Sequence, residues 1–558
     1  MTERGAARLA ARGPRPKALA WQPQPPIAGD PATARRLVGG VLLFGGRLVE
    51  TDQPLPWKIK PPDAVWAQHL HGHGWLDDAA AANETGIWQH LSAWAWDWLE
   101  HFEPGSGAGW RPDLVARRLT RQIAYSIELL KGQPAERSRR LFDALGTQTR
   151  FLGMRWHMTR PGVERLEALA GYVSGLLSLG GKPHQTRRAI ADLGEIAGAV
   201  IGPSGGIASR NPEDLARIVS LLAWSATAIE EAEFKPHPSH LSALNRAASA
   251  LRLVRHPGGG LACFHGGRSG SSVPLGRLLK QVSARALAPP LSDAVMGFLR
   301  LEAGSSVCIV DSAPPPGQAE AATAHASALA LDVSLSGQPV IVQCGSGLGF
   351  GERSARAARR APSHSSVEIA GECPASVQQK PGARPADLLT TSGTVQGRRS
   401  RDNKGAWAFL ESTQYVAQYG LVVERRLHLS AEGDRLSGED TVLATNAETR
   451  ARAVRKFRRI ATPGPIVARF HLHPDVEAEM ALADRAIALR LTDGSRWVMR
   501  TDADRVRLMP SVFHDENRPK PRATSQIVAE ASLLQYWGRI TWSFERLVDE
   551  RDERTKGA

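Results

Sequence analysis

The sequence predicts an α+β protein of two large parts, in which a series of helices precedes an antiparallel β-sandwich. Apolar residues recur at helical spacing through much of 57–255, and short β-branched or alternating runs fill the chain from about residue 297 onward. At 558 residues the chain is too long for one hydrophobic core. Its 42% hydrophobic and 23% charged residues are typical of a soluble globular protein.

The first 26 residues are basic and proline-rich and lack the apolar centre of a secretory signal, so we expect a disordered tail and a cytoplasmic protein. Residues 37–44 follow as a short β-hairpin. The sequence contains no run of 18 apolar residues, which excludes a membrane span.

Helical patterns joined by short loops with Gly or Pro fill the next part, and Pro112 stands where a helix would begin. Such a series of paired helices is typical of a helical toroid or a solenoid, and the absence of a repeat of fixed period weakens the solenoid. The expected helices are 87–102, 113–130, 134–159, 163–179, 184–200, 212–233 and 238–255.

A glycine-rich stretch at 255–272 ends the helical part, and one more helix is expected within 273–289. Beyond it, turn residues recur about every ten positions, which indicates a large antiparallel sandwich. The expected strands are 307–311, 329–333, 339–344, 405–410, 415–420, 421–430, 453–460, 466–473, 486–491, 495–500 and 535–544. The predicted divisions are a tail with hairpin (1–56), a helical domain (57–255), a linker with one helix (256–300), a sandwich (301–546) and a charged tail (547–558).

Charge narrows the class of partner. Lys and Arg number 70 and Asp and Glu 56, which gives +14 and favours an acidic polysaccharide, a nucleic acid or a membrane surface. No helix-turn-helix, RRM, KH or zinc-finger pattern is present, which disfavours nucleic acid. Basic residues are concentrated at 353–360 and 450–459, and we expect the second of these runs to lie on a strand. Each run forms either a solvent-exposed surface or a binding surface for a sulfated or uronic polymer. The four cysteines form no CxxC pair and are expected as reduced core thiols.

Three segments resemble, in order and spacing, segments of the heparinase II/III family of polysaccharide lyases. They are TAHAS at 323–327, QCG at 343–345 and PSHSSV at 362–367. The resemblance extends over about 57–544. It implies an incomplete (α/α) toroid followed by a β-sandwich, with an active cleft between them, and a place in the cell envelope or periplasm.

The resemblance also implies a metal site. His325 and His364 stand at the family's metal-ligand positions, often occupied by zinc, and Gln343 replaces the family's Asp. Two imidazoles and a neutral amide make a weak zinc site, because the third ligand is usually anionic. The alternative is a hydrogen-bonded histidine pair that joins strands.

Candidate catalytic residues come from two loops. Arg210 and Asn211 precede a helix and could hold a carboxylate at its N-terminus, although a simple N-cap explains them equally well. His265, in the glycine-rich linker, is a candidate proton shuttle or substrate ligand; the alternative is that it bonds the linker backbone.

Three positions depart from the lyase pattern: Ile207 and Thr323 replace histidines, and Asp214 replaces the catalytic tyrosine.

The segment 470–474 supplies the last candidates. We expect alternation to place His471 and His473 on one face of a strand and Arg469 on the other, with His471 catalytic. Substrate contacts are expected from Arg268, Arg469, His473 and Trp94.

The first hypothesis is therefore a lyase that cleaves a uronate-containing or sulfated polysaccharide by β-elimination. The alternative is a non-catalytic glycan-binding or envelope-assembly factor with an eroded site, and a nucleic-acid binder is the third.

Overall fold

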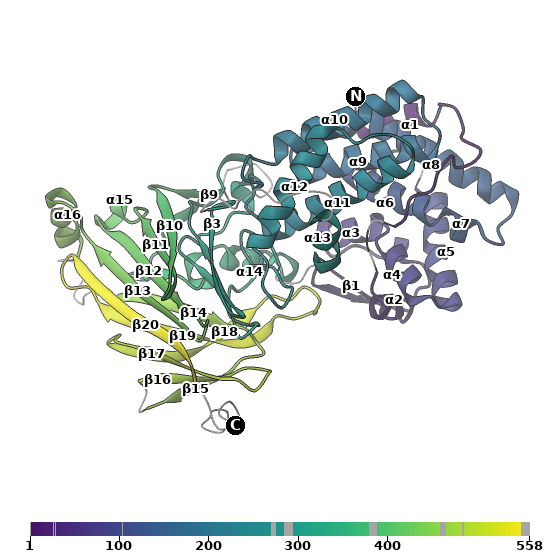
Figure 1. The fold of residues 1–558 in the computed structure, drawn as a ribbon. Helices are drawn as coiled ribbons and strands as arrows, with labels where there is room; N and C mark the ends of the chain where they lie inside the picture. The colour runs from purple at the N-terminus through teal and green to yellow at the C-terminus, as the bar shows by residue number, and fades with distance from the viewer. Residues whose placement is uncertain are drawn as a thin grey trace, which may run out of the picture.

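A computed structural model shows a helical part followed by a two-sheet β-sandwich, which confirms the predicted fold class (Figure 1). It describes residues 2–547, except positions 26, 28 and 103 and the segments 269–274, 284–293, 379–387, 458–464 and 483–484. The predicted charged tail beyond 547 lies outside the described residues. No helix within them has both the length and the apolar character needed to cross a bilayer.

The N-terminal segment belongs to the helical part, contrary to the expected disordered tail. Helix α1 (Glu3–Ala10) begins at Thr2, whose hydroxyl accepts a hydrogen bond from the backbone N–H of Gly5. Its three buried alanines, Ala6, Ala7 and Ala10, give a flat face that packs on α8. The expected hairpin forms later than predicted, as β1 (Val41–Phe44) and β2 (Arg47–Glu50), because 37–38 complete helix α2 (Pro31–Val38).

The predicted helices are present, with small shifts at their ends; the pattern at 113–130 is divided at Tyr125 into α6 and α7. They pack around a core rich in tryptophan, including Trp66, Trp75, Trp94 and Trp98. The helices are α3 (Ala64–His71), α4 (Trp75–Ala82), α5 (Thr85–His101), α6 (Pro112–Ala124), α7 (Ser126–Leu130), α8 (Ala135–Arg155), α9 (Val163–Ser178), α10 (Pro183–Val200), α11 (Pro212–Glu231), α12 (Pro238–Leu253) and α13 (Leu275–Ser283).

The first large sheet has the strand order β10-β11-β12-β13-β20-β17-β16-β15, all antiparallel. Its buried face packs on the second sheet through residues such as Trp497 and Phe544. Its strands are β10 (Val395–Asp402), β11 (Gly405–Ser412), β12 (Val422–Ser430), β13 (Arg435–Leu443), β15 (Glu477–Ala481), β16 (Ala486–Arg490), β17 (Arg496–Thr501) and β20 (Trp537–Leu547).

The second sheet lies nearer the helices and has the order β18-β19-β14-β6-β5-β4-β3, with β7 paired to β14. The three strands expected around 307–344 are its neighbours β4, β5 and β6, as predicted. Its strands are β3 (Phe298–Ala303), β4 (Ser306–Asp311), β5 (Leu331–Leu335), β6 (Gln338–Val342), β7 (Val367–Ile369), β14 (Pro465–Leu472), β18 (Arg505–Phe513) and β19 (Arg522–Ser532); β8 (Ala375–Gln378) and β9 (Leu388–Thr391) form a separate hairpin.

Two predicted strands are helices. Residues 415–420 form α15 (Val416–Tyr419), and most of 453–460 belongs to α16 (Ala447–Phe457). In α16 the buried Thr449 and Ala453 are one helical turn apart, and the Asn446 side chain accepts a hydrogen bond from the Thr449 N–H. The basic run at 450–459 was interpreted as an alternating strand, but its residues through Phe457 follow a helical period with one buried side.

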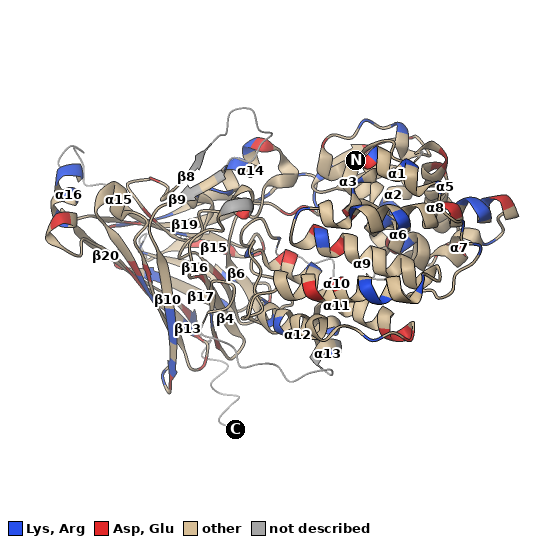
Figure 2. Ribbon diagram, turned by 90° about the horizontal axis from the view of Figure 1, so that it is seen from above, with Lys and Arg blue, Asp and Glu red and all other residues tan. Residues whose placement is uncertain are grey.

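The basic residues do not gather on one continuous surface. Figure 2 shows Lys and Arg positions interspersed with Asp and Glu positions over the helices and the strands. The run at 353–360 lies mostly on the short helix α14 (Glu352–Ala358). The four cysteines are free thiols, and all but Cys373 are buried, as expected.

Candidate functional site

Arg210 lies where the helical part meets the sandwich, in the turn before α11, with a backbone φ of +53°. A guanidinium has five N–H donors. Four of them reach backbone carbonyls at 2.5–3.2 Å, and the fifth reaches the carboxylate of Asp311. The four carbonyls belong to Met296, Gly297, Ala313 and Pro314. All five donors are therefore used within the protein, and Arg210 fastens the helices to the sandwich.

Asp311 ends strand β4 and is fully buried. Arg210 binds its Oδ1, while its Oδ2 accepts a hydrogen bond of 2.7 Å from the Ser327 hydroxyl and lies 3.4 Å from Nε2 of His265. Burial alone would raise the pKa of Asp311, but the charge of Arg210 and the nearby His265 outweigh it and lower the pKa to about 2. Asp311 therefore holds Arg210, His265 and Ser327 together as an anion.

His265 is fully buried, and its Nδ1 accepts a hydrogen bond of 3.3 Å from the backbone N–H of His325. Its other nitrogen faces Asp311. Burial lowers the pKa of His265, so the ring is neutral near pH 7. Nδ1 of His265 is thus hydrogen-bonded, whereas Nε2 approaches Asp311 at 3.4 Å without forming a hydrogen bond.

The three histidines of the predicted site do come together. The rings of His265 and His325 have centroids 6.4 Å apart, and those of His325 and His364 are 5.3 Å apart. All three are buried, with His325 only 4% exposed and His364 1%. The predicted convergence is present, but these imidazoles are not exposed to solvent.

Nε2 of His364 is buried and has no hydrogen-bond partner within the described part of the chain, whereas its Nδ1 faces a side chain that is hydrogen-bonded within the protein. Gln343 Oε1 accepts a hydrogen bond from the Ser365 N–H and lies 3.2 Å from Nδ1 of His364, while its amide donates to the Leu331 carbonyl. Among the residues that the structure describes, no group of three His, Cys, Asp or Glu side chains is arranged to hold a metal ion. The zinc site at His325 and His364 stays a prediction.

His471 is buried on strand β14 of the second sheet. Its Nδ1 lies 2.8 Å from the Ser511 hydroxyl, and its Nε2 lies 3.0 Å from the Pro362 carbonyl. Arg469 donates to Glu368 at 2.9 Å. The prediction that Arg469 and His471 lie on opposite faces was wrong, because residues two apart on β14 share a face.

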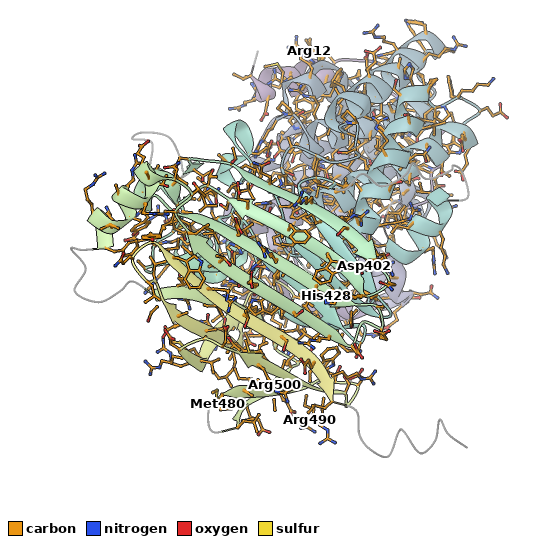
Figure 3. The ribbon with its side chains drawn as sticks, turned by 60° about the vertical axis from the view of Figure 1, so that its left-hand side comes forward. Arg12, Asp402, His428, Met480, Arg490 and Arg500 are labelled. Carbon is orange, nitrogen blue, oxygen red and sulfur yellow. The ribbon has the colours of Figure 1, made fainter. Side chains whose placement is uncertain are left out.

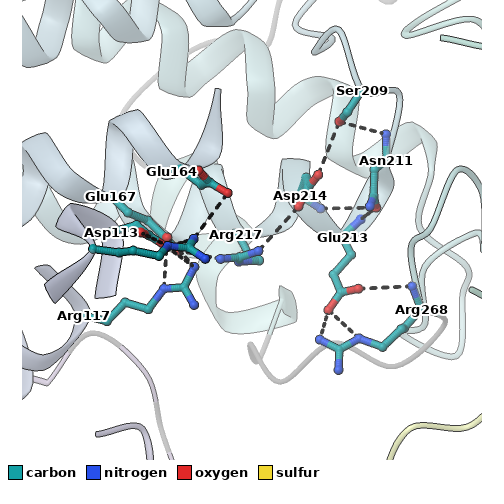
Figure 4. A network of polar contacts seen from close by, with 11 residues as sticks. Asp113, Arg117, Glu164, Glu167, Ser209, Asn211, Glu213, Asp214, Arg217 and Arg268 are labelled. Atoms are coloured by element: carbon teal, nitrogen blue, oxygen red, sulfur yellow. Dashed lines mark hydrogen bonds and ion pairs between the residues drawn. The ribbon is translucent and has the colours of Figure 1, made fainter. Parts of the chain in front are cut away.

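Asn211 is the N-cap of α11. Its side-chain oxygen accepts hydrogen bonds from the backbone N–H groups of Glu213, at 2.9 Å, and Asp214, at 3.4 Å. Asp214, at the family's tyrosine position, is 3.5 Å from Arg217, which also pairs with Glu167. Figure 4 shows these side chains within a chain of ion pairs and hydrogen bonds that extends from α6 to α11.

Arg268 bridges the two parts. It pairs with Glu213 at the start of α11 and, at 3.2 Å, with Glu516 of the sandwich, which also accepts a hydrogen bond from Ser346. Burial alone would lower the pKa of Arg268, but the two carboxylates outweigh it and raise it. The expected substrate arginine therefore already carries two carboxylate partners.

The remaining candidates lie elsewhere. Trp94 is in the helical core, 2% exposed, and its indole N–H donates to the Pro54 carbonyl. His473 follows β14 and contacts Asp475, beside a hollow of about 30 Å³ between 338–339 and 491–492.

Sequence reasoning missed Asp311, Glu213 and Glu516. Of these three residues, only Asp311 had a signal in the sequence, namely a carboxylate at the end of the apolar run 306–311.

The comparisons with known proteins agree with this architecture. Residues 287–543 match the family model described as heparinase II/III-like, C-terminal. The sandwich is a heparinase II/III-like domain. The resemblance inferred from the three short segments is confirmed.

Solved structures extend the likeness to the helical part of the chain. A crystal structure of heparinase III has 14% identity and a TM-score of 0.66, covering 99% of this chain and 90% of that one. A mutant of the heparan sulfate lyase HepC from Pedobacter heparinus has 13% identity and a TM-score of 0.59, covering 98% and 87%. At such identities the likeness shows the fold, a helical toroid with a β-sandwich.

A relative with higher identity is named for its localisation and not for a lyase activity. FtsZ-localized protein C from Caulobacter vibrioides (strain NA1000 / CB15N) is 29% identical over 555 residues, which covers 97% of this chain and 92% of that protein.

Proposed function

We propose two things about this protein. First, it is a non-catalytic binding protein that does not cleave a polysaccharide by β-elimination. Second, it localises with FtsZ. One observation carries the first half: each of the four side chains expected to be catalytic already has partners inside the protein. Arg210 and His265 surround Asp311, Asn211 caps α11, and His471 contacts Ser511 and Pro362.

Substrate chemistry supports the same conclusion. A lyase must neutralise a uronate carboxylate and then remove a proton from the adjacent carbon. The guanidiniums of Arg268 and Arg469 are neutralised by Glu213, Glu516 and Glu368. Neither arginine is free for a uronate, and Asp214 would repel one.

The second half comes from the relative that aligns along nearly the whole chain. That protein is named for its localisation with FtsZ, and at 29% identity over 97% of this chain it shares both parts of the fold. The contacts that Arg210, Asn211 and His471 already make inside the protein are consistent with a binding role of this kind.

Lyase activity is the competing function, supported by the fold. β-Elimination leaves an unsaturated uronate that absorbs in the near ultraviolet. We expect no such absorbance from heparan sulfate, chondroitin sulfate or alginate with this protein, in parallel with an active heparan sulfate lyase. Turnover that is lost in His265→Ala would restore the lyase hypothesis.

Localisation is tested by two experiments. A fluorescent fusion is expected to overlap with labelled FtsZ in cells, and the purified protein is expected to pellet with FtsZ polymers. A diffuse fusion together with no pelleting would contradict the proposed localisation with FtsZ and would leave untouched the proposal that the protein binds without β-elimination.

A further inference from the structure

The core of the helical part contains an arginine whose charge no carboxylate balances within the described residues. Arg118, on α6, is fully buried, and burial lowers its pKa to about 9, so the guanidinium is still charged at neutral pH. The buried carboxylates described in the helical part are Asp77 and Asp113. Asp77 binds Arg121 and Asp113 binds Arg111, each at 2.7 Å. Both carboxylates therefore already have a cation, and neither is the counter-ion of Arg118.

Three of the five N–H donors of Arg118 have acceptors. Nε donates to Oε1 of Gln148 at 2.9 Å, and Nη1 donates to the carbonyls of His71 and Gly109 at 3.1 and 2.9 Å. The guanidinium carbon lies over the ring of Trp98, 3.8 Å from its centroid. Nη2 is buried and has no acceptor in the part of the chain that the structure describes. Two N–H groups of a buried cation are therefore unsatisfied.

The orientation of two neighbouring amide side chains follows from Arg118. A guanidinium can only donate, so Gln148 must face it with Oε1, and Nε2 of Gln148 then donates to Oε1 of Gln122 at 2.8 Å. This leaves Nε2 of Gln122 buried and without an acceptor among the described side chains and carbonyls. Arg118 and Gln122 are four residues apart and lie on the same side of α6. Their unsatisfied nitrogens therefore belong to one region of the core, beside Gln148.

Two aromatic side chains add further nitrogens to this region. His73 is fully buried and packs on Trp98, with ring centroids 5.6 Å apart. Its backbone φ of +56° lies in the left-handed region, so the chain holds this ring in the core at a cost. Trp110 lies on Arg118, 5.8 Å from the guanidinium carbon to the ring centroid. Within the described ranges, both nitrogens of His73 and the indole N–H of Trp110 lack hydrogen-bond partners.

We propose that this cluster binds a small monovalent anion of halide size, held by Nη2 of Arg118 and Nε2 of Gln122, with the N–H of His73 as a further donor. The unsatisfied groups are donors, apart from one nitrogen of His73, so they require an acceptor. The charge of Arg118 favours an anion over water, because water would leave the buried charge uncompensated. The inference does not depend on the proposed function, because the cluster lies within the helical part and shares no residue with the group around Asp311.

Thermal unfolding of the full chain in sodium chloride and in sodium gluconate, at equal ionic strength, tests binding. Gluconate is too large for a halide site. Unfolding releases the anion, so the midpoint reports on binding even where exchange in the folded state is slow. At about 0.3 M salt, the difference in midpoint between chloride and gluconate is expected to be about 2–4 °C larger in the parent than in Gln122→Glu.

The variants separate the site from general effects of salt. Gln122→Glu keeps the acceptor for Gln148 and places a second oxygen where the amide nitrogen lies, so it supplies the anion within the chain. Gln89→Glu makes the same change of charge on the exposed face of α5 and should keep the difference of the parent. Arg118→Met removes the cation and should lose the difference. Arg490→Met should keep it, because Arg490 is exposed and lies on the sandwich, at the margin away from the helices (Figure 3).

Crystals grown in sodium bromide locate the ion by anomalous scattering. A bromide peak is expected beside Nη2 of Arg118 in the parent and is expected to be absent in Gln122→Glu. The proposal is overturned if the parent and Gln122→Glu show the same difference between the two salts, or if Gln89→Glu loses it as well. It is also overturned if bromide occupies only surface sites and water lies beside Arg118, a result that does not require any variant to fold.

Discussion

Arg210, His265 and His471 have the chemistry that a lyase site needs, and each is bound by neighbours far away in the sequence. The partners of Arg210 are between 86 and 104 residues along the chain. The sequence could nominate these side chains by type, because imidazole and guanidinium are suited to an acidic sugar. It could not show that their donors were already used, since that depends on contacts created only by folding.

Buried neutral histidines make the folded state sensitive to acid. Burial lowers the pKa of His364 to about 3 and that of His471 to about 4, whereas an unfolded histidine has a pKa of about 6.5. Between these values only the unfolded state binds the proton. The free energy of unfolding should therefore fall with decreasing pH by about 1.4 kcal/mol per unit for each such ring.

Urea unfolding at several values between pH 7.5 and 5 measures this slope. His364→Gln is expected to reduce the slope by about 1.4 kcal/mol per pH unit, the contribution of one proton. Substitution of an exposed histidine, His184→Gln, should leave the slope unchanged. An equal slope in the parent and His364→Gln would show that His364 does not titrate on unfolding.

At the scale of elements, the helices and the strands 307–311, 329–333 and 339–344 were predictable because each follows one clear period. Errors arose where a short segment fits two periods. Residues 415–420 alternate like a strand, yet Tyr415 and Tyr419 are buried one helical turn apart. The prediction also missed the short or edge strands β3, β7, β8, β9 and β10. Strands β13, β15, β18 and β19 were missed because their outward positions carry mixed residues.

The N-cap of α11 gives a prediction at this scale. Asn211→Ala is expected to lower the free energy of unfolding by about 1 kcal/mol, because two N–H groups of the first turn lose their acceptor. Asn211→Asp keeps an acceptor oxygen and should cost much less. Chemical denaturation measures both variants. An equal loss in both would mean that the amide nitrogen, rather than the capping oxygen, matters.

At the scale of the molecule, Arg210 joins the two parts through Asp311 and four carbonyls. Arg210→Met leaves Asp311 buried without its cation, so we expect a loss of about 3–5 kcal/mol and separate unfolding of the helices and the sandwich. Calorimetry and far-ultraviolet circular dichroism would resolve the two transitions.

Arg268 provides the matched comparison in the same junction. Its side chain is 33% exposed and its partners Glu213 and Glu516 are 13% and 10% exposed, whereas Asp311 is fully buried, so Arg268→Met should cost less than Arg210→Met and preserve a single transition. If Arg268→Met separated the transitions and Arg210→Met did not, the surface bridge would be the one that couples the two parts.

The position of β20 bears on how the sandwich is made during synthesis. Although it is the last described strand, β20 stands in the middle of its sheet, between β13 and β17. Until the ribosome has released it, the β10–β13 group and the β15–β17 group have no common neighbour, and each presents a bare edge. A nascent chain at that stage is exposed to misassembly with other nascent chains, and chaperones that cover strand edges should have their greatest effect there.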